Sequence, residues 1–369
     1  MGHKIVIATP VDFSNFGNRL QNYAVHKICE DMGLEPVTLA VEYAHTMKVI
    51  PKHCILQAIE KLKLGRLFAS VSKLKRLNKS VRAWQFTRDE IKTEYVKNQK
   101  ELNKALNDAA YFGIGGDQVL APYWRNIIWF ATFSEMREDR KICFAPSFGS
   151  DRLPESYLKS VIIPEMEKVQ HLAVREQSGC EMIKEHLDRE ALRICDPVVM
   201  LTKKDWQHIA ERYPVKAEQP FVLLYFLGEI KDSYREHIEK KAREHGCRII
   251  DVSRGSLSDE AACNPMEFVS YLNAAKTVFT DSFHAVMLSL ILNNNVVIFE
   301  RVGGEKMNTR ILELIKRYRL SNCVFSESCS KDGATESGCY DKDYVNSVLE
   351  SERSMANEYY QKFRPDCVL

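Results

Sequence analysis

The sequence predicts an α/β protein made of two doubly wound domains, each with a parallel sheet covered by helices. Three observations support this prediction. The chain has 369 residues, which is more than one ordinary hydrophobic core organises. Short apolar strands alternate with helical patterns from end to end, which is typical of parallel sheets with helices on both faces. The alternation restarts after Asp196-Pro197, where we place the domain boundary.

The first domain is predicted to span residues 1–195. Residues 5–8 are apolar and predict a buried strand, and residues 18–32 have a helical pattern that ends at Gly33. Its remaining strands are predicted at 37–41, 111–114, 142–145 and 171–175, and its remaining helices at 155–169 and 177–186.

The second domain is predicted to span residues 196–341. A last helix, within residues 342–369, follows a loop rich in Gly, Ser and Cys, and we expect it to pack back on the first domain. Two Rossmann-like domains of this kind face each other across a cleft, which is a GT-B-like fold. Ligands bind such sheets at the carboxyl ends of strands, so functional residues are expected in the loops there. The strands are predicted at 221–227, 248–252, 277–280 and 296–299, and the helices at 233–245 and 265–275.

Composition excludes several classes of function. The 52 basic and 50 acidic residues give a net charge of +2, so no global positive field attracts nucleic acid. The 11 cysteines include no Cys-x-x-Cys pair and no zinc pattern, so we expect reduced thiols and no metal. A strand is predicted almost at the N-terminus, and no apolar stretch is long enough to cross a bilayer. We therefore expect a cytoplasmic protein.

Residues 61–82 form a basic segment, with eight Lys or Arg residues and no acidic residue, interleaved with apolar side chains. One interpretation is peripheral contact with the inner face of the membrane, where each cation contributes on the order of 1 kcal/mol. The other, which we prefer, is a solvated helix whose apolar stripe packs on the first sheet.

The strongest functional signal follows residues 277–280. It places His284 in the first turn of a helix, directly after a strand. Backbone N–H groups and the positive end of the helix dipole meet there, so the position suits an anion together with a titrating side chain. The alternative is that Asp281 or Ser282 caps the helix and His284 only packs. The sequence leaves both interpretations open.

Charged side chains also stand at other element ends. Arg175 ends a predicted strand and suits a carboxylate or phosphate, and an ion pair with Glu176 is the alternative. Asp117 follows two glycines and either binds a hydroxyl or caps a helix that begins near Val119. Arg310 lies in the first turn of an amphipathic helix and either reaches the cleft or forms an exposed ion pair.

Amide side chains cluster at the start of the first predicted helix. Asn18, Gln21 and Asn22 lie about one turn apart, so their amides share a helix face and suit the hydroxyl groups of a sugar. Capping and bonds to the loop backbone are the alternative. Ser147 follows another strand and either lines the cleft or holds its own turn.

Four loops together resemble the polysaccharide pyruvyl transferase family. They are residues 15–24, 115–119, 174–179 followed by 195–198, and 280–284 with 308–311. The resemblance implies a GT-B-like fold and transfer of pyruvate from phosphoenolpyruvate to two hydroxyls of a sugar. The product is a cyclic ketal on a precursor of a cell-surface polysaccharide, such as capsule or exopolysaccharide. It implies no cofactor beyond phosphoenolpyruvate as co-substrate, and a sugar or lipid-linked oligosaccharide as acceptor.

The resemblance also implies roles for the candidate residues. Proton transfer falls to His284 with Asp117, and the first and second domains become the acceptor and donor sides. The donor-binding residues are Arg175, Ser282, Phe283 and Arg310, and the acceptor-binding residues are Asn18, Gln21, Asn22, Gln118 and Ser147.

The chain departs from the family pattern at Ser282, where many members carry an arginine. Either another cation, Arg175 or Arg310, takes its place, or the donor is not phosphoenolpyruvate. One competing function is a GT-B glycosyltransferase that uses a nucleotide sugar, with Glu300 or Glu305 as the ribose-binding carboxylate. The other is a non-catalytic member that binds glycan.

Overall fold

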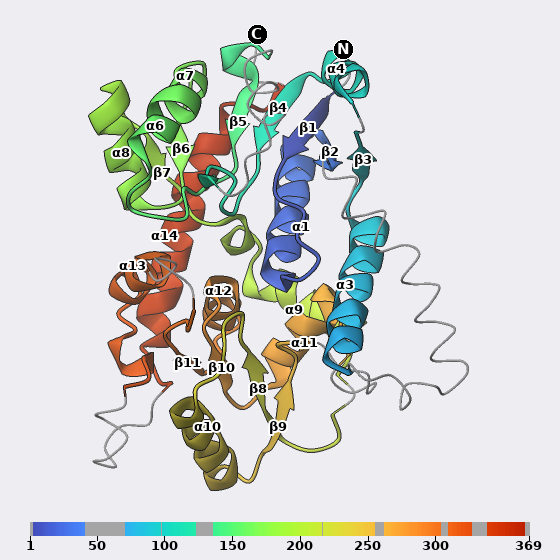
Figure 1. Cartoon of the computed structure of the whole chain (residues 1–369), viewed down its shortest axis with the longest axis vertical. Helices are drawn as coiled ribbons and strands as arrows, with labels where there is room; N and C mark the ends of the chain where they lie inside the picture. Colours follow the sequence, from blue (N-terminus) through green and yellow to red (C-terminus); the bar gives the residue numbers. More distant parts are fainter. Residues whose placement is uncertain are drawn as a thin grey trace.

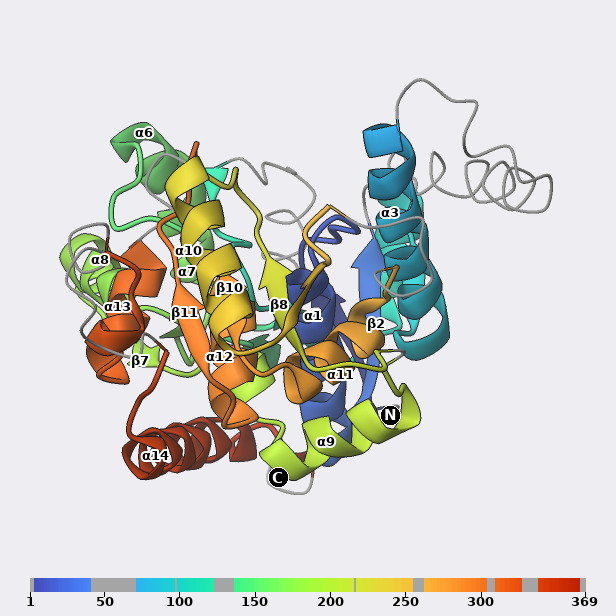
Figure 2. The ribbon, with the colours of Figure 1, turned by 90° about the horizontal axis from the view of Figure 1, so that it is seen from below.

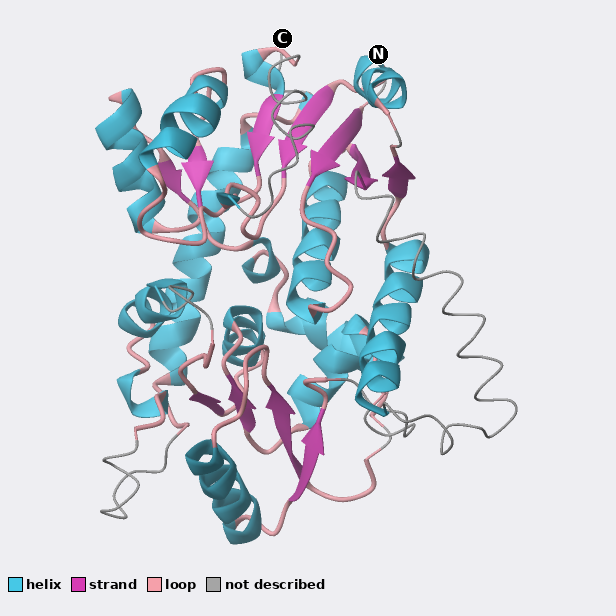
Figure 3. Ribbon diagram, viewed as in Figure 1, coloured by secondary structure: helices cyan, strands magenta, loops and turns pink. Residues whose placement is uncertain are grey.

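The computed structural model describes residues 3–40, 71–96, 98–122, 136–215, 217–254, 262–303, 309–326 and 338–365. Two parallel sheets lie at opposite ends of the molecule, and their strands point toward each other (Figures 1 and 3). The predicted α/β class with a GT-B-like arrangement is confirmed. Because loops at the carboxyl ends of both sheets meet between them, this region is where a ligand site is expected.

The first sheet has five parallel strands in the order β3-β2-β1-β4-β5, the order of a Rossmann fold. Its central strand, β1, is apolar and almost wholly buried, as expected for a strand covered on both faces. The strands are β1 (Lys4–Ala8), β2 (Glu35–Ala40), β3 (Thr93–Tyr95), β4 (Tyr111–Ile114) and β5 (Lys141–Cys143), and the helices that accompany them are α1 (Phe16–Asp31), α3 (Val71–Glu90) and α4 (Gln99–Asn107).

The helix predicted over 155–169 is divided in the structure. A π-helical turn, Leu158–Ile162, separates α6 (Glu155–Tyr157) from α7 (Ile163–Met166). Pro164 explains the interruption, because proline has no N–H to donate and its ring crowds the preceding turn. Beside this segment lie the short paired strands β6 (Ala173–Val174) and β7 (Leu192–Arg193), with α8 (Gln177–Leu187) between them in sequence.

The second sheet has four parallel strands in the order β11-β10-β8-β9. Its strands lie close to the predicted ranges. They are β8 (Phe221–Tyr225), β9 (Arg248–Asp251), β10 (Val278–Thr280) and β11 (Val296–Ile298), and the helices of this part are α9 (Lys203–Arg212), α10 (Asp232–Glu244), α11 (Pro265–Ala274), α12 (Phe283–Ile291) and α13 (Thr309–Arg317). Single 3₁₀ turns lie at Glu138–Arg140, Pro197–Val199 and Ser321–Cys323.

The last helix, α14 (Lys342–Gln361), runs from the level of the second sheet to that of the first (Figure 1). Near its end, the hydroxyl of Tyr359 accepts a hydrogen bond from the N–H of Cys143 at 2.9 Å. The ring of Tyr360 stacks on Phe144 with centroids 5.5 Å apart. These contacts attach the C-terminal helix to the edge strand of the first sheet.

Helix α3 contains residues 71–82 of the basic segment, whereas residues 61–70 lie outside the described part of the chain. Lys79 of α3 is buried, and its ammonium donates to the carbonyl of Ser253 at 2.8 Å. The same ammonium lies over the rings of Phe16 and Tyr225, at 4.6 and 4.8 Å from their centroids. Helix α3 therefore connects the two halves along one side of the molecule (Figure 2). In the described ranges no helix is long and apolar enough to span a membrane.

Candidate active site

His284 lies in the first turn of α12, as predicted, and is buried. Ser282 is the N-cap residue, but its side chain makes no capping hydrogen bond. The carboxylate of Asp281 points elsewhere and accepts the N–H groups of Leu227 and Gly228 at 2.7 and 2.8 Å. Neither side chain caps α12, so backbone N–H groups of its first turn are left for another partner.

The buried carboxylate of Asp196 joins His284 to Arg175. Its Oδ2 accepts from Nη1 of Arg175 at 2.6 Å and lies 3.4 Å from Nε2 of His284. Asp196 stands just after β7, where its Oδ1 also accepts the N–H of Val198 and caps a 3₁₀ turn. Residues from both halves of the chain therefore meet at one carboxylate oxygen.

The surroundings keep Asp196 ionised. Burial alone would raise its pKa, but the neighbouring charges and hydrogen bonds of His284 and Arg175 outweigh burial and hold the pKa below its ordinary value. The ionised carboxylate therefore lies between the imidazole of His284 and the guanidinium of Arg175 and fixes the position of both side chains.

The first turns of α1 and α12 touch at His284. A Cβ on Gly17 would lie 2.5 Å from Cβ of His284 and 2.6 Å from its Nδ1, so only glycine fits there. The ring thus has Nε2 toward Asp196 and Nδ1 against the start of α1. This close contact explains the glycine in the first of the four loops.

Asp117 lies in a turn with a φ of 63°, and residues 119 and 120 also form a turn, so in the described residues Asp117 does not cap a helix that begins at Val119. Its carbonyl instead accepts the N–H of Val119 at 2.9 Å. Its carboxylate accepts from the amide of Asn18 at 2.8 Å and lies 3.6 Å from Nη1 of Arg310. Burial would raise the pKa of Asp117, but the charges of His284, Arg175 and Arg310 lower it below the ordinary value.

Two guanidinium groups lie over the ring of Phe283, the residue before His284. The distances to the ring centroid are 4.8 Å for Arg175 and 5.8 Å for Arg310. Arg175 also lies 3.6 Å from Glu176, so the predicted ion pair exists, but its Nη2 has no hydrogen-bond partner among the described residues. One donor of this buried arginine is therefore available to an anion.

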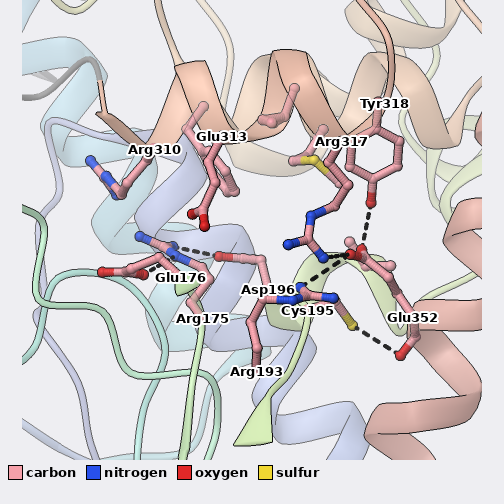
Figure 4. A pocket seen from close by; sticks show the side chains of 14 residues that line it. Arg175, Glu176, Arg193, Cys195, Asp196, Arg310, Glu313, Arg317, Tyr318 and Glu352 are labelled. Carbon is pink, nitrogen blue, oxygen red and sulfur yellow. Dashed lines mark hydrogen bonds and ion pairs between the residues drawn. The ribbon is translucent and has the colours of Figure 1, made fainter. Parts of the chain in front are cut away.

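A cavity of about 40 Å³ opens beside these groups (Figure 4). Its far side is organised by Glu352 of α14, which pairs with Arg193 at 3.2 Å and Arg317 at 2.8 Å. The volume has room for a few water molecules. Its charged lining consists of Arg175, Arg193, Arg310 and Arg317 with Glu176, Asp196, Glu313 and Glu352.

A match to a protein-family model shows which family the chain belongs to. The model of the family described as polysaccharide pyruvyl transferase matches residues 15–301. The chain belongs to this family. The protein is therefore a transferase of polysaccharide biosynthesis, as the four loops predicted.

One solved structure supports the fold of the transferase. The UGT89C1 structure of Arabidopsis thaliana, complexed with UDP-L-rhamnose, superposes with a TM-score of 0.53 at 9% identity, covering 99% of each chain. UDP-GlcNAc 2-epimerase from Neisseria meningitidis gives a TM-score of 0.46 at 12% identity, covering 98% of this chain and 94% of its own. The first likeness supports the GT-B-like fold and nothing finer. No curated protein matches the sequence.

The predicted acceptor residues of the transferase do not all lie together. Asn22 accepts from the hydroxyl of Thr38 in β2 at 3.0 Å, so it faces the first sheet and not His284. Gln21 donates to Thr9 at 2.9 Å, while its Oε1 has no partner within the described ranges. Asn18 alone of the three amides contacts a charged candidate, Asp117.

The remaining two acceptor candidates hold the loop after β5. Ser147 donates to Oε1 of Glu176 at 2.7 Å, and the same oxygen accepts the N–H groups of Phe148 and Gly149. Gln118 packs against Gly149, where a Cβ would lie 2.8 Å from Nε2 of the amide. Both side chains therefore support the loop next to Arg175.

From the sequence, Glu176 was predicted only as a possible ion-pair partner of Arg175, and no role in the site was predicted for Asp196. The structure makes Asp196 the link between His284 and Arg175 and makes Glu176 the anchor of the loop after β5. The sequence feature that could have identified Asp196 is a carboxylate at the end of a short apolar run, directly before proline. In the described part of the chain, no group of three His, Cys, Asp or Glu residues could hold a metal, and the cysteines there are free.

Proposed function

We propose that the transferase moves pyruvate from phosphoenolpyruvate to two hydroxyls of a sugar, forming a cyclic ketal and releasing phosphate. The observation that carries the proposal is the meeting of His284 with Asp196 and Gly17, because it brings a proton donor of the second half against the first. Family membership supports the same reaction. The expected setting is assembly of a capsule or exopolysaccharide precursor in the cytoplasm.

The donor is proposed to bind between α12 and Arg175. Its carboxylate or phosphate would take the unbonded donor of Arg175 and the N–H groups in the first turn of α12, which no side chain caps. Arg310, stacked on the same Phe283 ring, can close on the other side. Two cations at this ring support the idea that they replace the arginine absent at Ser282. The cavity of about 40 Å³ must enlarge to admit the donor.

The proposed reaction needs one acid and one base. A sugar hydroxyl adds to C2 of phosphoenolpyruvate and gives its proton to Asp117, while C3 takes a proton from His284 and becomes a methyl group. The bond from C2 to phosphate then breaks, and a second hydroxyl adds to C2 and passes its proton to the departing phosphate. A proton moving from Asp117 back to His284 restores both. Such acid–base help typically contributes about 10²–10⁴-fold.

The acceptor is proposed to lie at the start of α1. Asn18 and Asp117 already share a hydrogen bond of 2.8 Å, and Gly17, the residue before Asn18, lies against Nδ1 of His284. An amide next to a carboxylate suits two neighbouring hydroxyls. The buried contacts of Lys79 favour a packing role for α3 over peripheral membrane contact.

The test is phosphate release from phosphoenolpyruvate in the presence of a glycoside with neighbouring hydroxyls. We expect release that depends on the glycoside and is abolished in His284→Ala, while a cooperative urea transition shows that the variant still folds. Retained release in His284→Ala would remove this residue from the mechanism.

Calorimetry separates this function from its competitors. Heat on titration with phosphoenolpyruvate but not with a nucleotide sugar supports pyruvate transfer. The opposite result supports a glycosyltransferase, and heat from neither supports a glycan-binding role. Of the two carboxylates suggested for ribose, Glu300 is exposed after β11, and Glu305 lies outside the described residues.

A further inference from the structure

A second groove lies at the carboxyl end of the second sheet, separate from the Arg175 cavity. Its volume is about 620 Å³, within the usual range for a ligand site of roughly 300–1,000 Å³. One wall consists of loops that follow β8, β9 and β11, and the other consists of α3 and the loop after β1. Strand-end loops in open α/β sheets commonly bind ligands.

The groove is strongly cationic. Four basic side chains line it against one carboxylate, Glu229. Arg76 of α3 and Arg254 after β9 are exposed, and neither makes an ion pair within the described ranges. The basic residues are Arg76, Lys79, Arg254 and Arg301.

The other two cations are fixed in place. Lys79 is held by the carbonyl of Ser253 at 2.8 Å, and Arg301 donates to the carbonyl of Asp281 at 3.0 Å. An isolated β-bridge between Glu229 and Val302 joins the loops after β8 and β11. This wall of the groove is therefore held by its own backbone pairing. A preformed cationic wall costs little to order when an anion binds.

The groove is connected to the reaction centre through Asp281. This carboxylate accepts the N–H of Gly228 at 2.8 Å and lies 3.4 Å from Nε of Arg301, and it stands three residues before His284. The groove is also lined by Ser14, just before the N-cap of α1. A ligand that extends from the start of α1 would therefore enter the groove.

We propose that this groove binds a diphosphate group carried by the acceptor sugar. Two arginines that form no ion pair in the described ranges, beside two fixed cations, match the spread of negative charge on a diphosphate. The hydroxyl of Ser253, which accepts the N–H of Phe226 at 2.8 Å, still has its own proton to donate. This inference rests on the proposed pyruvate transfer for the identity of the acceptor, but the anion site itself does not. The diphosphate belongs to either a nucleoside diphosphate sugar or a prenyl diphosphate sugar.

The test is calorimetric titration of the whole protein with inorganic pyrophosphate. We expect binding that weakens about tenfold or more in Arg254→Gln and in Arg76→Gln, because each loses a charge-assisted hydrogen bond. Arg235→Gln, an exposed change on α10, is the matched control and should bind like the wild type. Saturating phosphoenolpyruvate should not displace pyrophosphate, since it is expected at the Arg175 site.

Three results would overturn the inference: no binding of pyrophosphate, equal binding by Arg254→Gln, or displacement by phosphoenolpyruvate. Repeating the titration with uridine diphosphate and with farnesyl diphosphate identifies the carrier, since the one that binds more tightly than pyrophosphate makes contacts beyond the diphosphate. The same loss in Arg254→Gln is expected for both probes. Failure of pyruvate transfer would leave the pyrophosphate result intact, so the two proposals fail separately.

Discussion

Replacing Asp196 by asparagine should remove the link between Arg175 and His284 while preserving shape. The side chains of Asp196 and Arg175 are 1% and 4% exposed, so the substitution leaves a buried guanidinium without its nearest anion. Breaking a buried pair by removing one partner costs about 3–5 kcal/mol. Because Glu176 remains 3.6 Å from Arg175, we expect the lower end, about 3 kcal/mol of unfolding free energy at neutral pH.

The loss should depend on pH in a defined direction. The pKa of Asp196 is lowered because the charges of His284 and Arg175 outweigh the effect of burial. A carboxyl group with a lowered folded pKa stabilises the fold at every pH above its unfolded pKa of about 3.9 and loses this contribution as pH falls further. The difference between the wild type and Asp196→Asn should thus be constant at neutral pH and shrink below about pH 4.

Urea unfolding at several pH values measures both effects, with phosphate release from phosphoenolpyruvate as the activity readout. Asp188→Asn is the control, because Asp188 is exposed and its pair with Lys184 contributes at most about 1 kcal/mol. A loss below 1 kcal/mol for Asp196→Asn at neutral pH, or one that grows on acidification, would refute the reasoning.

Three further changes test other contacts. Gly17→Ala places a Cβ 2.5 Å from His284, so we expect about 1–3 kcal/mol less unfolding free energy and a large fall in phosphate release, and an active variant of normal stability would contradict the contact. Burial lowers the pKa of Lys79 to about 8. Between about pH 8 and 10, Lys79 is therefore protonated in the unfolded chain but deprotonated in the folded protein. The free energy of unfolding of the wild type should rise over this range by roughly 2–3 kcal/mol relative to that of Lys79→Met. If urea unfolding gives the same difference between the wild type and Lys79→Met at both ends of this pH range, the reasoning about a buried ammonium is wrong. Glu352→Gln weakens contacts to Arg193 and Arg317 and should cost about 3 kcal/mol, measured by thermal and urea unfolding, whereas a neutral effect would show that α14 is held by its apolar contacts alone.

Local sequence patterns predicted most of the fold because they act over short distances. The strand at 111–114 was predicted residue for residue, since a buried parallel strand is a continuous apolar run. The single helix predicted at 155–169 failed because the periodicity ignores the missing N–H of Pro164. The position of His284 at a helix start followed from a strand pattern directly before a helix pattern.

The partners of the site residues could not be predicted in the same way. Asn22 and Asn18 occupy the same helix, yet Asn22 bonds to Thr38 and Asn18 to Asp117, 99 positions along the chain. Which partner an amide meets depends on how α1 packs between the sheet and α12, and periodicity carries no information on that packing. The role of Asp196 was missed for the same reason, because it depends on a contact with His284, which is far away in sequence.

The contact between Gly17 and His284 limits how relatives of this transferase can be recombined. A chimera that exchanges one half for that of another family member brings together two surfaces that did not evolve against each other. If the incoming first domain carries a residue other than glycine at position 17, its side chain displaces the imidazole of His284 from Asp196. We expect such a chimera to fold but to lose its activity. Gly17 is therefore the position to inspect before any exchange of acceptor specificity is attempted.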